Sequence, residues 1–193
     1  MKHISTRELF AYWDRRRGRR SAPERGEIEP GPIRRVLGDT FILTFDAQAG
    51  HPFRLAGTRV CALFCRELKG EGFVGLWAQA ARTAVHERLA GVADESIGLV
   101  AGVNGRTADG GTLDLELLLL PLRHRGHAHA RLLGVLAPLS VPYWIGAMPL
   151  QGLTLGAFRH LGPAIETAPR FTSAAGSGRL RHGLVVYDGD RPE

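Results

Sequence analysis

Five arginines close to the start of the chain have the side-chain type and spacing needed to bind an anion. These are Arg15, Arg16, Arg17, Arg19 and Arg20. A guanidinium group donates paired hydrogen bonds to a phosphate, so the cluster could clamp the phosphates of a cyclic dinucleotide. The alternative is a solvated basic face, because only Lys2 and Lys69 among the 25 basic residues are not arginine.

The sequence contains no recognisable catalytic set. It has no Gly-x-Ser-x-Gly nucleophile elbow, no Walker loop and no dinucleotide fingerprint after a predicted strand. Asp114 and Glu116 share one face of a predicted strand and could do acid–base work. We expect Glu116 to form an ion pair with Arg54 or Arg106 instead. We therefore expect no catalytic residues and no enzymatic activity, since an enzyme would need an acid, a base or a metal converging on a cavity.

Two groups of residues have spacings that metal sites use. His124, His127 and His129 cluster at a predicted turn, where they could bind a transition metal. Cys61 and Cys65 would face the same side of a helix, but zinc sites usually need a second pair of ligands. We expect a solvated histidine turn and two buried cysteines, with no metal and no cofactor.

The composition describes an ordinary globular chain. Its 193 residues are 44% hydrophobic and 23% charged, with a net charge of +6, which excludes collagen, a coiled-coil rod and a disordered chain. Two cysteines exclude a disulfide scaffold, so we expect reduced thiols and a cytoplasmic location. Residues 132–158 carry no charge, but Pro138, Pro142 and Pro149 interrupt them, so we expect no membrane span.

The elements that must position these residues follow from the hydrophobic periodicity. Residues 5–17 are predicted to form an amphipathic helix that ends at Gly18. Its apolar stripe must cover either its own sheet or a neighbour's, and it is our candidate for a dimer or docking surface. The stripe consists of Leu9, Phe10, Tyr12 and Trp13.

Beyond the helix, a proline-containing linker leads to residues whose period changes. Residues 40–46 and 52–58 alternate like two strands of a hairpin, and residues 59–92 are predicted to be helical. Three further strands joined by tight turns are predicted over residues 97–107, 113–122 and 130–139. This order predicts an α+β fold with an antiparallel sheet rather than a parallel one.

Several motifs of the chain resemble those of a family of small bacterial PAS-like regulators. They are Tyr12-Trp13 with Arg17-Gly18-Arg19, the run from Phe53 to Thr58, the run from Glu116 to Leu122, and the segment from Pro142 to Gly146. The resemblance covers residues 5–160. It implies a five-stranded antiparallel sheet with a helical block between strands 2 and 3, preceded by an amphipathic helix. The expected parts are a helix and basic linker (1–37), a PAS-like domain (38–160) and a poorly ordered tail (161–193).

The resemblance also implies a role in recognition rather than reaction. In PAS domains the inner sheet face and the helical block enclose a cavity, which here could hold a small ligand or simply be filled core. The residues expected to line it are Phe53, Leu55, Trp77, His86, Leu99, Ala101, Leu115 and Leu117. We expect a non-enzymatic regulatory protein that docks to signalling proteins as a homodimer. The alternative is an effector that binds an anionic nucleotide through the arginine cluster. No recognition helix is visible, so DNA is not an expected partner.

Overall fold

The structure is a computed structural model that describes residues 1–124, 127–162, 179–181 and 184–186. The chain divides into two compact units, Met1–Pro163 and Ala164–Glu193. In the second unit, β7 (Arg179–Arg181) pairs with β8 (Leu184–Val186) in an antiparallel hairpin. Of the predicted poorly ordered tail (161–193), residues 163–178, 182–183 and 187–193 lie outside the described residues.

The first unit is built on an antiparallel sheet whose strands lie in the order β2-β1-β5-β4-β3-β6. The edge hairpin is formed by β1 (Thr40–Thr44) and β2 (Phe53–Ala56). The long strands β3 (Gly98–Thr107), β4 (Thr112–His124) and β5 (His127–Pro138) form a meander. The α+β fold with an antiparallel sheet is therefore confirmed, with six strands in place of five, because β6 (Leu150–Leu161) pairs along β3.

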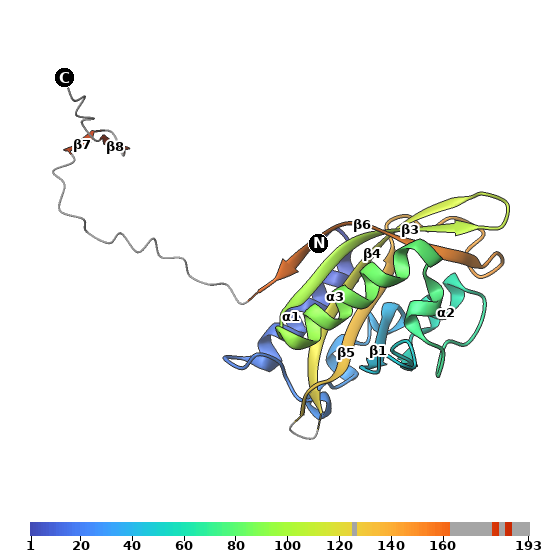
Figure 1. The fold of residues 1–193 in the computed structure, drawn as a ribbon, viewed down its shortest axis with the longest axis horizontal. Coiled ribbons are helices and arrows are strands. Elements are labelled where there is room, and N and C mark those ends of the chain that lie inside the picture. Colours follow the sequence, from blue (N-terminus) through green and yellow to red (C-terminus); the bar gives the residue numbers. More distant parts are fainter. Residues whose placement is uncertain (125–126, 163–178, 182–183, 187–193) are drawn as a thin grey trace. The chain divides into compact units, whose positions relative to one another are not determined.

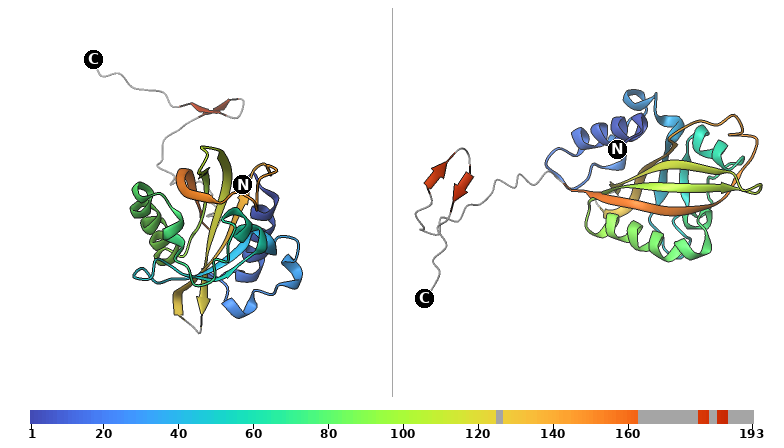
Figure 2. Two further views of the ribbon diagram at one scale, coloured as in Figure 1. Left: turned by 90° about the vertical axis from the view of Figure 1, so that its right-hand side faces the viewer. Right: turned by 90° about the horizontal axis from the view of Figure 1, so that it is seen from above.

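Helices lie on both faces of the sheet (Figures 1 and 2). On one face, here called the inner face, lie α2 (Thr58–Leu63) and α3 (Arg82–Asp94), which form the block between β2 and β3. The opposite, outer face carries α1 (Ile4–Arg17) and the segment that follows it. That segment is here called the cover segment (residues 19–39), and it contains short 3-10 helices at Arg25–Glu27, Gly31–Ile33 and Leu37–Asp39.

The inner face holds the larger hydrophobic core, and its centre is aromatic. Phe41, Phe53 and Phe73 pack with ring centroids 5.5 to 5.7 Å apart, and Trp77 lies against Phe73 at 5.8 Å. All four side chains are almost fully buried. Because aromatic rings bury large areas, this cluster holds the helical block to the sheet.

The outer face has its own core, which α1 completes. Leu9, Tyr12 and Trp13 are buried, and the indole Nε1 of Trp13 donates a hydrogen bond to the Pro121 carbonyl at 2.9 Å. The predicted docking stripe therefore covers the chain's own sheet, which leaves only Phe10 partly exposed. The prediction of a docking surface is corrected for the three buried residues, which are not accessible to a second protein in this structure.

None of the helices in the described part of the chain is long and apolar enough to cross a membrane.

Candidate anion-binding site

A β-bulge in the edge strand β2 brings two side chains to the outer face. Ile42 of β1 pairs with Leu55, but the next residue, Leu43, pairs with Phe53, so Arg54 is an extra residue on β2. A bulge breaks the usual alternation of side chains. Phe53 consequently points into the inner core, whereas Arg54 and Leu55 both line a hollow on the outer face.

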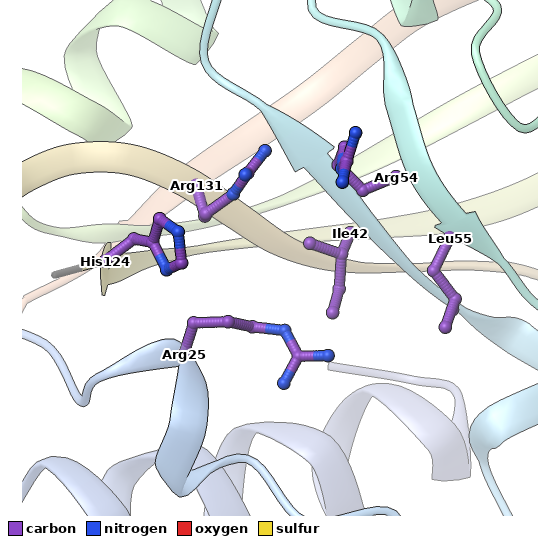
Figure 3. A pocket seen from close by; sticks show the side chains of 6 residues that line it. All are labelled: Arg25, Ile42, Arg54, Leu55, His124 and Arg131. Carbon is purple, nitrogen blue, oxygen red and sulfur yellow. The ribbon is translucent and has the colours of Figure 1, made fainter.

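This hollow, here called the arginine hollow, has a volume of about 560 Å³. Figure 3 shows the side chains around it, which come from the cover segment, from β1 and β2, and from the ends of β4 and β5 that lie beside the cover segment. It is lined by Arg25, Ile42, Arg54, Leu55, His124 and Arg131. The volume lies within the range of roughly 300–1,000 Å³ that is usual for small-molecule sites.

The cover segment holds Arg25 over the sheet. Its first 3-10 turn is closed by Glu27, whose carboxylate accepts the backbone N–H of Glu24 at 2.7 Å. The same carboxylate pairs with Arg20 at 3.0 Å. Arg20 and this backbone amide lower the pKa of Glu27. Glu27 is thus already paired, and the Arg25 side chain has no hydrogen bond or ion pair within the described residues.

The charged side chains that line the arginine hollow are all positive. No lining residue is acidic, and Arg54, like Arg25, has no ion-pair partner in the described part of the chain. Arg131 donates a hydrogen bond to the Thr44 hydroxyl. Burial lowers the pKa of Arg131, and the positive charges of Arg54 and Arg25 lower it further. The three guanidinium groups repel one another. A bound anion would offset this repulsion and would accept hydrogen bonds from them.

The N-terminal arginines are arranged differently from the predicted clamp. Arg17 pairs with Asp14 at 2.6 Å, Arg16 with Glu29 at 3.3 Å and Arg20 with Glu27 at 3.0 Å. The side chains of Arg16 and Arg17 also lie over the rings of Tyr12 and Trp13. Arg15 and Arg19 are exposed. None of the five lines the arginine hollow.

The predicted inner cavity is occupied by packed side chains. Phe53, Trp77, Leu99, Ala101, Leu115 and Leu117 are buried on the inner side of the sheet. Leu55 is an exception, because the bulge turns it to the outer face, where it is 43% exposed. The indole Nε1 of Trp77 is buried without a hydrogen-bond partner among the described residues.

His86 lies on α3, where it contacts the turn between β1 and β2. Its Nδ1 is 3.2 Å from Nε2 of His51, which is a buried residue that the sequence does not single out. The backbone at His51 is left-handed, with φ +58°, and the ring lies against Phe45. The pair ties the helical block to the edge hairpin.

The structure does not bring the predicted acid–base and metal-binding residues together into one site. Glu116 is buried, and it accepts the backbone N–H groups of Lys2 and His3 at 2.6 and 2.9 Å instead of pairing with Arg54 or Arg106. Cys61 is buried and Cys65 is exposed. Within the described residues, no three His, Cys, Asp or Glu side chains are grouped closely enough to hold a metal. The side chains of His127 and His129 lie outside the described part.

Sequence reasoning does not find the arginine hollow. Arg25, Arg54 and Arg131 are far apart along the chain, and no single motif contains more than one of them. The available signal is weak: Arg131 is the one charged residue in the apolar run from residue 130 to 139. The hollow becomes apparent only when the sheet order places β2 and β5 on either side of β1.

Comparison with known proteins gives a family and several similar structures. A family model described as PAS domain matches residues 1–137. No curated protein sequence matches the chain. A light-oxygen-voltage domain studied with a flavin analogue is 15% identical, with a TM-score of 0.45, over 56% of this chain and 82% of that one. The LOV protein of Rhodobacter sphaeroides is 15% identical, with a TM-score of 0.43, over 54% and 60% of the two chains. The dark-state LOV domain of the blue-light photoreceptor Aureochrome1 is 13% identical, with a TM-score of 0.44, over 56% and 80%.

Proposed function

This chain belongs to the PAS domain family, and from that premise we propose that it is a non-catalytic sensor that binds a small anionic ligand in the arginine hollow. A regulatory role in signal transduction accords with the family. The anionic ligand is suggested by one observation: three guanidinium groups surround a hollow that has no acidic lining residue. Such a site binds phosphate or carboxylate groups through charge-assisted hydrogen bonds.

Ligand binding would act on the part of the fold that connects the outer face to the edge hairpin. Arg25 belongs to the cover segment, Arg54 to the edge strand β2 and Arg131 to β5. An anion that contacts all three would draw the cover segment toward the sheet. We propose that this movement couples ligand binding to docking with a signalling protein or with a second copy of the chain.

The experiment that tests the anion site is calorimetric titration with pyrophosphate. The wild-type chain should bind the probe, and Arg54→Ala should weaken binding about tenfold, the usual effect of losing one charge-assisted hydrogen bond. Arg106→Ala is the matched control, because Arg106 is an exposed arginine of β3 that lies outside the arginine hollow. Absence of binding, or equal loss in both variants, would contradict the proposal.

The same titration separates the arginine hollow from the N-terminal arginines. If the effector role belonged to the N-terminal cluster, Arg15→Ala with Arg19→Ala would remove binding and Arg54→Ala would not. Arg15 and Arg19 are exposed and take no part in the ion pairs of Arg16, Arg17 and Arg20, so their loss leaves those ion pairs in place. Recovery of the probe unchanged after incubation would further support a role without catalysis.

A second candidate is a ligand within the inner core. The buried indole N–H of Trp77 supports it, since buried donors without a partner are costly and rare. Native mass spectrometry of the purified chain, compared with the denatured mass, tests it directly. A bound mass that persists in Arg54→Ala and is lost in Trp77→Phe would place the ligand inside the core.

A further inference from the structure

A second hollow adjoins the arginine hollow on the outer face and is almost wholly apolar. It has a volume of about 110 Å³ and is here called the apolar hollow. The cover segment contributes Ile28, Pro30 and Ile33, and the sheet contributes Leu133. Arg25, Ile42 and Leu55 line both hollows, so the two hollows are direct neighbours.

The polar atoms of the apolar hollow are already engaged or lie at its boundary. Thr40 carries the one hydroxyl among its lining residues, and that hydroxyl donates to the Val36 carbonyl at 2.8 Å. Arg25 is the one charged lining residue, and it faces the arginine hollow as well. A polar base or sugar would therefore lose its hydrogen bonds to water here without gaining others, which is unfavourable.

We propose that the ligand is an amphipathic anion, in which a phosphate or carboxylate group occupies the arginine hollow and a short aliphatic chain occupies the apolar hollow. This inference rests on the proposed function and narrows the class of ligand. The chain is short because the apolar hollow is smaller than a cavity of about 150 Å³, which holds a benzene molecule. Ile42 and Leu55, which are shared by both hollows, would contact the first carbon atoms after the anionic group.

The test is a titration of the full chain with a homologous series of phosphates: inorganic phosphate, methyl phosphate, ethyl phosphate and butyl phosphate. Each buried methylene should strengthen binding about fourfold. Adenosine monophosphate has the same anionic group with a polar attachment, and it should bind no more tightly than methyl phosphate.

Two variants with opposite effects locate the two parts of the ligand. Leu55→Ser should remove the dependence on chain length, so that every member of the series binds with a similar affinity. Arg54→Ala should weaken every member of the series by the same factor. Leu139→Ser is the matched control, because Leu139 is 41% exposed against 43% for Leu55 and lies in neither hollow.

The outcomes separate this inference from the proposed function. If no member of the series binds, the anion site itself is wrong. If every member binds equally, or if adenosine monophosphate binds more tightly than butyl phosphate, the anion site stands and the aliphatic chain is wrong. A chain-length effect that survives Leu55→Ser would place the chain elsewhere and overturn the inference.

Discussion

Nε2 of His51 lies 3.2 Å from Nδ1 of His86, and this contact joins the β1–β2 turn to helix α3. The backbone N–H of Asp46 donates to Nδ1 of His51 at 3.3 Å, so these hydrogen bonds assign the His51 proton to Nε2, which donates to His86. Burial lowers the pKa of His51 to about 4, and the neighbouring His86 contributes to the shift. His51 is therefore held neutral in the folded chain.

The stability of the chain should fall as the pH is lowered from 6.5 toward 4. An unfolded histidine titrates near pH 6.5, so in this window the unfolded state binds a proton that folded His51 does not. Above pH 6.5 neutral His51 costs the folded chain no stability. At pH 4 the free energy of unfolding should be lower by up to about 3 kcal/mol. Urea unfolding at a series of pH values measures it.

His51→Asn is the variant that isolates this effect. Asparagine tolerates the left-handed backbone at this position, where φ is +58°, and does not titrate. The variant should show a shallower loss of stability between pH 6.5 and 4. If its pH profile is parallel to that of the wild type, the buried histidine is not the cause.

Trp13→Ala should destabilise the whole first unit. The indole of Trp13 is buried against the outer face of the sheet, and its Nε1 is hydrogen-bonded to the Pro121 carbonyl. Replacing a buried tryptophan with alanine costs about 3–5 kcal/mol. Ile4→Ala, at a side chain of α1 that is 52% exposed, is the control and should cost less than about 1 kcal/mol. Thermal unfolding of both variants checks this, and equal melting temperatures would show that α1 does not stabilise the sheet.

Glu116→Gln should weaken the attachment of the start of α1 to the sheet and should change how that attachment depends on pH. Burial raises the pKa of Glu116, but the hydrogen bonds from the Lys2 and His3 backbones outweigh this and lower it overall. The stabilisation from Glu116 is therefore present above pH 4.5 and is lost as the pH falls below it. Hydrogen exchange of the first turn of α1 should quicken in the variant at pH 7. The exchange rate of these amides in the wild type should approach that in the variant only under acidic conditions.

Arg54→Ala should stabilise the chain in the absence of any anion, although it weakens anion binding. Burial is the main cause of the lowered pKa of Arg131, and removing Arg54 relieves the part of the lowering that comes from its neighbouring positive charge. Because Arg54 is exposed, the gain is only about 0.5 kcal/mol at low ionic strength and should vanish in 1 M salt, where charges are screened within about 3 Å. Melting curves with and without salt measure it. Destabilisation at low salt would show that Arg54 has a structural role instead.

Much of the fold can be predicted from the sequence because its elements have clear periods. The alternating leucines of β4 and the tight turns around it specify an antiparallel meander. The strand β6 is harder to predict, because from Gly156 to His160 it is exposed and shows no alternation of buried and exposed residues. Its position follows from pairing with β3, which is a tertiary interaction.

The candidate site is harder to predict than the fold. The sequence Phe53-Arg54-Leu55-Ala56 has the appearance of a regular strand, which would place Leu55 beside Phe53 in the inner core. The bulge depends on how β2 pairs with β1, and no local pattern specifies it. The arginines near the N-terminus draw attention by their density, yet Arg16, Arg17 and Arg20 pair with acidic neighbours.

Because the bulge in β2 depends on one extra residue, a single deletion could change the outer face during evolution. Deleting the single codon for Arg54 would restore regular pairing between β1 and β2, and it would remove one cation while leaving Leu55 opposite Ile42 on the outer face. A small change in gene length could thus reduce the positive charge of this recognition surface while preserving the domain. Relatives that differ by one codon at this point would then respond to different chemical signals.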